Sequence, residues 1–229
     1  MQAIILAGGK GKRFHPYSLV LPKPLIPIKD KPIMEIIIRQ LAKFGIMDVT
    51  VSTGYLSELI EAYFGDGAKF GVHISYSKEE TPLGTIGPLT LLKNLEEDFL
   101  VLNGDTLTDI NLSDLFIYHM KTRSLLTIAS YRKPVKIDLG VLRFDGANRL
   151  TEYIEKPELE YLVSMGIYVV NRSAIARVEA NTYFDFPSLV HLLLSGGDKI
   201  SVYDFHGIWH DLGSINNYEV ATQDVDRVI

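Results

Sequence analysis

Short apolar runs alternate with amphipathic segments along the amino-terminal half of the chain. Continuous apolar runs are typical of buried strands, and they occur at residues 2–7 and 99–103; residues 48–53 and 72–77 are also predicted to be strands. Apolar residues at helical spacing predict helices over residues 32–44, 57–64, 85–94 and 112–121. Pro32 fits a first helical position, and Gly45 is a typical stop signal. The alternation predicts parallel βαβ units with helices on both faces of a sheet.

The carboxyl-terminal half has a different pattern. Alternating residues predict strands at 125–131, 140–144, 149–155, 163–170 and 200–205, with a DGAN hairpin turn at 145–148. Helical spacing returns at 186–194 and 214–226. This half is therefore predicted to be more antiparallel. No linker, repeat or low-complexity stretch divides the chain, so residues 1–229 are predicted to form one α/β domain. We expect a Rossmann-like, mixed but mostly parallel sheet between helices, with a nucleotide-binding half (1–110) and an acceptor half (111–229) that carries a small antiparallel part.

Composition excludes several classes of function. The net charge of −5 is unlike that of proteins that bind nucleic-acid backbones, and we expect no nucleic-acid partner. The chain has no cysteine, which excludes disulfides, thiolate metal sites and cysteine nucleophiles. No apolar run reaches membrane-spanning length and no signal peptide is visible, so we expect a cytoplasmic protein without a membrane partner.

A glycine-rich basic segment, GGKGKRF, follows the first predicted strand. Three cations, Lys10, Lys12 and Arg13, lie within four residues, and they would repel one another unless an anion lay among them. The dinucleotide fingerprint fails because its last glycine is replaced by Phe14. The P-loop also fails, because Arg13 follows Gly11-Lys12 where serine or threonine is required. Backbone amides and cations in such a turn can still bind a polyphosphate, although a solvated surface turn is the alternative.

Several motifs resemble those of one family. The segments LAGGKGKRFHP and LPKPLIPI resemble the L-A-G-G-x-G-T-R-L-x-P…P-K-P-[LM] pattern of sugar-1-phosphate nucleotidyltransferases. The resemblance continues in order through PLGTIGPL (82–89), NGD (103–105), EKP (155–157), GIYVVN (166–171) and WHDLGS (209–214). It thus spans the whole chain. One departure is Lys12, which stands where the family usually has a phosphate-contacting threonine. The lysine either keeps that role with a charge or alters the preference for the nucleotide.

The resemblance implies transfer of a nucleotidyl group from an NTP to a sugar-1-phosphate, with release of pyrophosphate. Since both reactants are anions, charge neutralisation and positioning are expected to matter more than proton transfer. Arg13, Lys23 and Asp105 are the implied catalytic residues, with the arginine fork suited to bridging phosphate oxygens. The implied nucleotide-binding residues are Leu6, Ala7, Gly8, Gly9, Gly11, Lys12, Arg13, Lys23, Pro82, Gly84, Thr85, Asn103 and Gly104.

Magnesium is the implied cofactor. Asp105 follows a buried strand and Asp211 lies in WHDLG, so two separate elements supply carboxylates. Two carboxylates with phosphate oxygens and waters are a typical Mg²⁺ arrangement. The alternatives are a turn aspartate at 105 and a helix-entry residue at 211. Asp109 is a weaker ligand candidate and is instead expected to begin the next helix.

The sugar-phosphate residues implied by the resemblance are Gly140, Glu155, Lys156 and Gly166. Glu155 is assigned to sugar hydroxyls and Lys156 to the sugar phosphate, with a solvated charge pair as the alternative. Ser164 replaces the asparagine common just before the GIY motif, which leaves the sugar undetermined.

The nucleobase also stays open. PLGTIGPL resembles the L-G-T-A-G-[AP]-L of mannose- and heptose-1-phosphate guanylyltransferases, which favours GTP and a role in nucleotide-sugar supply for cell-surface polysaccharides. Cytidylyl, uridylyl or thymidylyl transfer to another sugar or small phosphate is the alternative. A non-catalytic paralogue that binds nucleotide-sugar is a second alternative, and a homodimer is possible.

Overall fold

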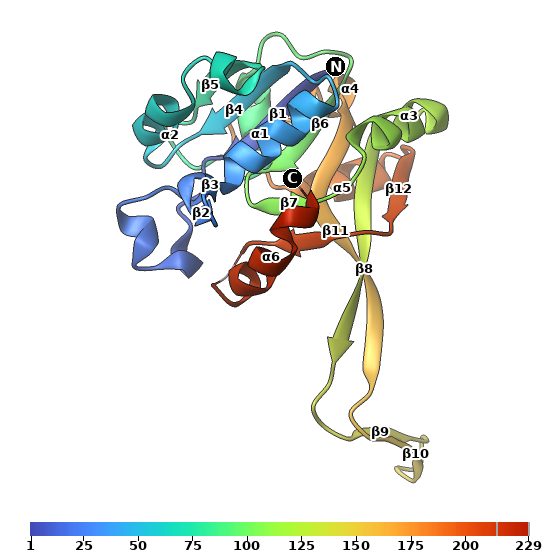
Figure 1. The fold of residues 1–229 in the computed structure, drawn as a ribbon. Coiled ribbons are helices and arrows are strands. Elements are labelled where there is room, and N and C mark those ends of the chain that lie inside the picture. The colour runs from blue at the N-terminus through green and yellow to red at the C-terminus, as the bar shows by residue number, and fades with distance from the viewer. Residues whose placement is uncertain (214, 229) are drawn as a thin grey trace.

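A seven-stranded sheet forms the centre of the molecule (Figure 1). The computed structural model describes residues 1–213 and 215–228. All neighbouring strands run parallel except at β11, which is antiparallel to both of its neighbours. In spatial order the strands are β12 (Ile200–Phe205), β8 (Leu126–Lys136), β11 (Glu158–Asn171), β6 (Asp98–Asn103), β1 (Gln2–Ala7), β4 (Asp48–Thr53) and β5 (His73–Lys78). The predicted α/β class with a mostly parallel sheet is confirmed.

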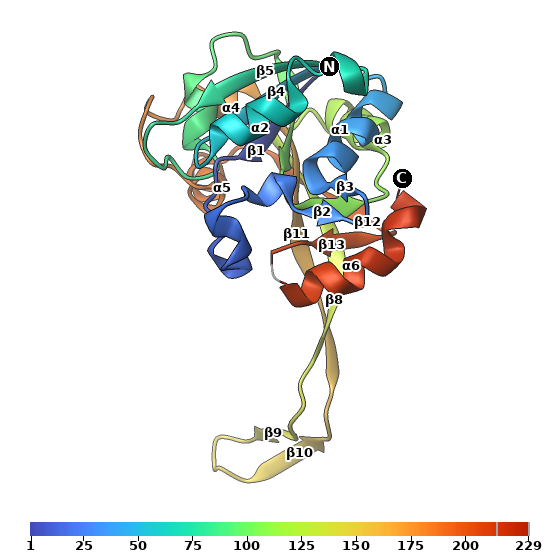
Figure 2. The ribbon, with the colours of Figure 1, turned by 60° about the vertical axis from the view of Figure 1, so that its left-hand side comes forward.

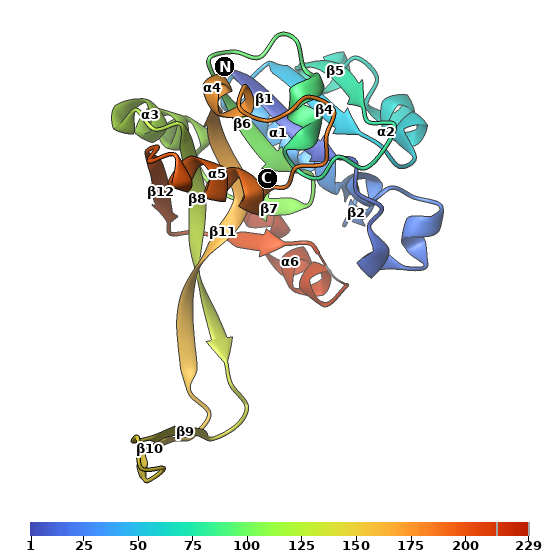
Figure 3. The ribbon, with the colours of Figure 1, turned by 180° about the vertical axis from the view of Figure 1, so that it is seen from behind.

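Helices cover both faces of the sheet, as Figures 1 and 3 show from opposite sides. The alternation in β1 explains why: Ala3, Ile5 and Ala7 face one apolar cluster, whereas Ile4 faces the other. The first cluster takes apolar residues from α1 (Ile33–Lys43), α2 (Ser57–Phe64), α3 (Leu112–Thr122) and α6 (Ile215–Val228). The second takes them from α4 (Arg172–Ile175) and α5 (Phe186–Ser195).

The helix predicted over 85–94 is wrong as an α-helix. The structure has only a 3₁₀ helix there, Gly87–Leu91. The segment before α5 holds the start of this 3₁₀ helix, because the amides of Ile86 and Gly87 both donate to the carbonyl oxygen of Phe184 at 2.9 Å. The prediction that Asp109 begins a helix is also wrong. Asp109 accepts a hydrogen bond from the amide of Ile208 at 2.7 Å, and Asn111 caps α3.

Several short elements complete the chain. Two three-residue strands that periodicity does not reveal, β7 (Thr106–Thr108) and β13 (Trp209–Asp211), pair with each other. Another small pair consists of β2 (Pro27–Ile28) and β3 (Lys31–Pro32). Single-turn 3₁₀ helices occur at Lys12–Phe14, Tyr17–Leu19, Lys23–Leu25 and Ala68–Phe70. Of the helix predicted over 214–226, Ser214 lies outside the described residues. No helix in the described residues is long and apolar enough to cross a membrane.

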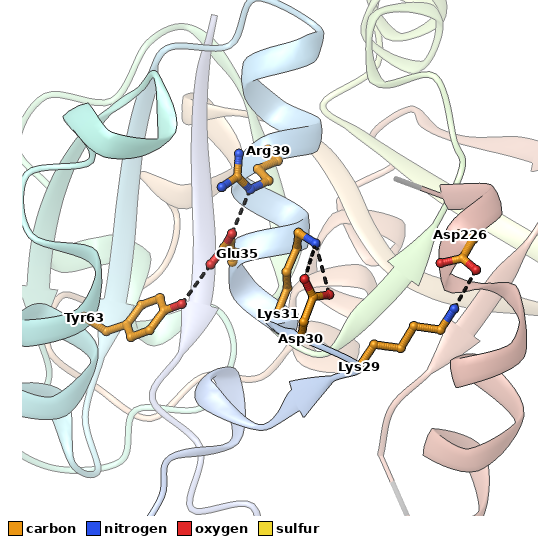
Figure 4. Close-up of polar contacts among 7 residues, drawn as sticks. All are labelled: Lys29, Asp30, Lys31, Glu35, Arg39, Tyr63 and Asp226. Atoms are coloured by element: carbon orange, nitrogen blue, oxygen red, sulfur yellow. Dashed lines mark hydrogen bonds and ion pairs between the residues drawn. The ribbon is translucent and has the colours of Figure 1, made fainter.

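Polar contacts fix the connection between the amino-terminal loops and the helices (Figure 4). Glu35 in α1 is buried, and it accepts hydrogen bonds from Arg39 at 2.8 Å and from the Tyr63 hydroxyl of α2 at 2.9 Å. Lys29, in the β2–β3 turn, pairs with Asp226 of α6 at 2.6 Å. These contacts join segments from both ends of the chain on one side of the sheet.

A two-stranded arm projects from the body. We define the arm as residues 132–162, which include the outer parts of β8 and β11 together with β9 (Val141–Phe144) and β10 (Leu150–Ile154). The third strand, β12, pairs with β8 only as far as Tyr131, so the ribbon beyond that point has two strands. Figures 1, 2 and 3 show the arm leaving the body on the side where α6 and the amino-terminal loop lie.

Candidate active site

A cavity of about 890 Å³ opens at the carboxyl ends of β1 and β6. The chain runs from β1 outward through β4 to β5 and then returns to the other side of β1 as β6. Ligands of open α/β sheets bind at such a reversal of strand order. Every residue predicted to bind nucleotide lines this cavity: Leu6, Ala7, Gly8, Gly9, Gly11, Lys12, Arg13, Lys23, Pro82, Gly84, Thr85, Asn103 and Gly104.

The loop after β1 carries unpaired cations into the cavity. Gly11 has a φ of 58°, which suits glycine, and its carbonyl oxygen accepts from the amide of Phe14 at 2.8 Å. The Phe14 side chain is buried and anchors the turn. Lys12 and Arg13 are exposed, and within the described residues the side chain of neither forms an ion pair or hydrogen bond. The turn therefore presents two cations, neither of which forms an ion pair with a described carboxylate.

Lys23 and Asp105 meet at the base of the cavity. Lys23 lies between two prolines, and its ammonium group donates a hydrogen bond to Oδ2 of Asp105. The two side chains are 11% and 24% exposed, so the ion pair is largely withdrawn from water. The same ammonium group lies 5.4 Å from the ring centroid of Phe14. Phe14, from the segment LAGGKGKRFHP, and Lys23, from the segment LPKPLIPI, are thus both brought to the end of β6.

Asp211 lies beside Asp105 because β13 pairs with β7. The amide after Asp211 donates to the carbonyl oxygen of Asp105 at 2.9 Å. Arg13 also reaches this point. A Cβ atom placed on Gly213 would lie 2.8 Å from Oδ2 of Asp211 and 2.9 Å and 3.0 Å from the two terminal nitrogens of Arg13. Hence the residues predicted to hold metal and those predicted to bind phosphate converge on one region.

The pair of carboxylates fits a magnesium ion that phosphate completes. Asp105 and Asp211 supply the hard oxygen ligands that Mg²⁺ prefers. Within residues 1–213 and 215–228 no cluster of three or more acidic or histidine side chains could hold a metal by itself. Substrate phosphates and waters would therefore have to supply the remaining ligands, as is usual for Mg²⁺ in phosphoryl-transfer sites.

Glu79 is a cavity residue that sequence reasoning missed. It follows β5, and its Oε2 accepts a hydrogen bond from the amide of Leu83 at 3.0 Å. Its other oxygen lies against the glycines, 2.4 Å from the position that a Cβ atom on Gly8 would occupy. Burial raises the pKa of Glu79 above its ordinary value. The only sequence signal was its place at the end of a predicted strand, just before the PLGT motif.

Backbone contacts shape the far wall of the cavity. Gly84 has a φ of 81°, and a Cβ atom there would lie 2.6 Å from the carbonyl oxygen of Phe184. The Thr85 hydroxyl accepts from the amide of Phe186 at 2.7 Å. These contacts explain why this loop carries glycine and threonine, and they hold it against the start of α5.

Three predicted sugar-phosphate residues lie away from the cavity. Gly140, Glu155 and Lys156 are all in the arm, where no part of the cavity lining is found. They are nevertheless close to one another, because Gly140 packs against Tyr153, whose hydroxyl donates to Glu155 at 2.7 Å. The roles assigned to these residues stay predictions, and their placement is taken up below.

Gly166 is the fourth predicted sugar-phosphate residue, and it lies next to the cavity. A Cβ atom there would lie 2.5 Å from Nδ2 of the cavity residue Asn103. With a φ of 76°, the position favours glycine.

Comparison with known proteins gives one consistent family. The family model described as "Nucleotidyl transferase" matches residues 2–227. A UTP–glucose-1-phosphate uridylyltransferase of Synechocystis sp. is 33% identical over 98% of this chain and 63% of its own length. A mannose-1-phosphate guanylyltransferase of Mycobacterium tuberculosis is 31% identical over 100% of this chain and 66% of its own length. The chain thus spans about two thirds of the length of these relatives.

The fold also matches that of solved proteins. The crystal structure of a putative glucose-1-phosphate thymidylyltransferase from Bacillus anthracis superposes with a TM-score of 0.79 at 20% identity. The match covers 100% of this chain and 96% of that one. At this level of identity the likeness establishes the fold.

Proposed function

This chain belongs to the nucleotidyl transferase family, and on that premise we propose that it transfers a nucleotidyl group from an NTP to a sugar-1-phosphate. The observation that carries the proposal is the convergence of Arg13, Lys23 and Asp105, which line one cavity, with Asp211 directly beside them. The relatives support the acceptor, since both are named for transfer to a sugar-1-phosphate.

In the proposed reaction an oxygen of the sugar-1-phosphate attacks the α-phosphorus of the NTP. A new P–O bond forms at the α-phosphorus, and the bond from it to the bridging α–β oxygen breaks. Pyrophosphate leaves with that electron pair. Because the attacking phosphate is already ionised near neutral pH, no general base is required, and the barrier is lowered by positioning and by charge.

The cations of the loop are suited to the charge that develops on pyrophosphate. Lys12 and Arg13 have no described protein partner, so no ion pair has to break before they bind phosphate. The planar guanidinium of Arg13 can donate to two phosphate oxygens at once. Lys23, stiffened by prolines, binds an oxygen of the same triphosphate and balances the charge of Asp105.

Magnesium is proposed as the cofactor, held by Asp105 and Asp211. When bound, it neutralises phosphate charge and polarises the α-phosphorus. The chain's own residues then orient the two reactants. The short β7–β13 pair sets the spacing of the two carboxylates, because it fixes both strands through backbone hydrogen bonds.

GTP is the proposed nucleotide, and Glu79 is the group that favours it. Guanine presents two neighbouring donors, N1–H and the N2 amino group, which a carboxylate can accept together. Uracil and thymine present one donor flanked by carbonyl oxygens, which a carboxylate repels. Glu79 lines the cavity beside Gly8 and has one oxygen free of the Leu83 amide. The names of the relatives include both guanylyl and uridylyl transfer and do not choose between these bases.

A matrix of the common NTPs against a panel of sugar-1-phosphates, with Mg²⁺, tests the proposal through pyrophosphate release. We expect turnover with GTP and at least one hexose- or heptose-1-phosphate, and none without acceptor or metal. Binding of nucleotide without turnover in every combination would contradict the proposed activity. Turnover preferring UTP would keep the activity but refute the role given to Glu79.

A further inference from the structure

The arm carries the predicted sugar-phosphate turn, but it carries it away from the cavity. In the described part of the chain, all hydrogen bonds and ion pairs of residues 138–156 have both partners inside the arm. Lys156 is exposed and has no described partner. Its φ of 46° is unusual for a residue other than glycine. The turn at Glu155 and Lys156 is thus well defined and makes no hydrogen bond or ion pair with described side chains outside the arm, yet it lies far from the cavity residues with which it is predicted to bind the sugar phosphate.

The arm is too apolar for a segment that faces only water. Of the 22 exposed large hydrophobic residues in the described chain, nine lie within its 31 residues. They are Val135, Leu139, Leu142, Phe144, Leu150, Tyr153, Leu159, Tyr161 and Leu162. Two-stranded ribbons are marginally stable alone, and apolar patches of this kind mark interaction surfaces. A partner surface is therefore needed to cover it.

The arm does not readily fold back on its own cavity. Its strands pair without a break from Arg132 opposite Leu162 to Lys136 opposite Glu158. At about 3.3 Å per residue this ladder alone holds the arm end roughly 15 Å from the body. Neither strand has a glycine between its root and the far turn, in residues 132–139 or 157–163. With this ladder intact, Lys156 could reach its own cavity only through a bend of the whole arm at its root, where β11 has a register shift between Ser164 and Tyr168.

A second copy of this chain offers both surfaces that the arm lacks. The loop beside the cavity exposes Tyr17, Leu19 and Val20, which are 63%, 56% and 76% accessible. These apolar residues follow directly on the phosphate-binding turn. An arm docked against them would cover its own apolar residues and would bring its end to the same cavity, whose cations are unpaired.

We propose that two copies exchange arms, so that the Glu155–Lys156 turn of each completes the sugar-phosphate site of the other. The inference rests on the proposed function, since it concerns where the acceptor binds. A two-fold dimer provides the required geometry, because each copy gives one arm and receives one. Lys156 then binds the acceptor phosphate in the partner's cavity, and Glu155 accepts from sugar hydroxyls.

Complementation between inactive variants tests the exchange. Asp105→Asn disables the cavity and leaves the arm intact, whereas Lys156→Ala does the reverse. Co-expressed with different tags and purified through both, the mixed dimer has one complete site, so about half of the wild-type rate per dimer should return. Arg149→Ala, which removes another exposed cation near the arm end, is the matched control and should keep full activity. A pure mixed dimer without activity, or no mixed dimer, would overturn the proposal.

A second experiment does not depend on catalysis. Because the chain has no cysteine, Lys156→Cys and Lys12→Cys create single thiols at the arm end and at the cavity. Mixing the two under oxidising conditions should give a covalent dimer that neither gives alone. A double variant that cross-links only within one chain would instead show that the arm folds back. If the two cysteine variants cross-link but wild type releases no pyrophosphate with any substrate pair, the proposed function fails while arm exchange stands.

Discussion

Asp105→Asn should remove both the ion pair with Lys23 and one proposed metal ligand. The asparagine side chain has the same shape as the aspartate side chain, so the substitution creates no packing void. What changes is the charge: Lys23, only 11% exposed, is left nearly buried and cationic without its counter-ion. The ammonium group is held by its loop between two prolines and cannot easily turn to water.

The cost to stability follows from this burial. Replacing a charge-assisted hydrogen bond by a neutral one, and leaving the ammonium group without its counter-ion, costs about 2 kcal/mol at this degree of burial. For a chain of 229 residues, that loss lowers Tm by roughly 4–8 °C. Bound Mg²⁺ and NTP should no longer raise Tm as they do for wild type, because one carboxylate ligand is gone.

Asp226→Asn is the matched control. It breaks a Lys–Asp pair of the same chemistry, but Lys29 and Asp226 are 41% and 74% exposed. Exposed pairs contribute roughly 0–1 kcal/mol, so Tm should change by no more than a few degrees and turnover should persist. Calorimetry and pyrophosphate release measure both effects. Equal loss of Tm in the two variants, or unchanged turnover of Asp105→Asn, would refute the reasoning.

Arg13→Ala should lower kcat by roughly two orders of magnitude, the scale for one charge-stabilising group; a change confined to KM would argue against its role. Glu79→Gln should lower kcat/KM for GTP roughly tenfold while sparing UTP. Because burial raises the pKa of Glu79, KM for GTP in wild type should rise as pH falls through that raised pKa. At a pH above the raised pKa the ionised carboxylate lowers the stability of the folded protein. Glu79→Gln should therefore have a Tm equal to or higher than that of wild type at pH 7, and the difference in Tm should disappear towards pH 4. Gly84→Ala should cost roughly 2–3 kcal/mol, since its φ is 81° and the backbone of Phe184 is close, whereas Gly146→Ala, with no neighbour within 4 Å, should be neutral by thermal unfolding.

The pattern of apolar and polar residues correctly predicted the elements whose burial in the core is visible in their own sequence. β1 and β4 were placed at their observed bounds: the apolar run of β1 is buried on both faces, and β4 alternates valines, which face one apolar cluster, with buried threonine and serine. The helix predicted over 85–94 failed because the backbone of residues 182–184 packs against it, which no local pattern records. Likewise β7 and β13 are too short for periodicity, and each exists through a partner about a hundred residues away.

The candidate site divides in the same way. Glycines and cations of the amino-terminal loop could be identified from sequence, since their chemistry is local. Glu79 could not, because its role depends on the approach of β5 to Gly8. The β9–β10 hairpin at the arm end was predicted, but the long outer parts of β8 and β11 were missed. The strand predicted over 125–131 ends where β12 ends, and the continuation to Lys136 depends on pairing with β11.

A crystal structure with a non-hydrolysable GTP analogue and Mn²⁺ tests the central claim most directly, because anomalous scattering locates the metal. We predict the metal between Asp105 and Asp211, the triphosphate against Arg13 and Lys23, and the guanine at Glu79. A triphosphate bound outside this cavity, or a metal on other ligands, would contradict the account.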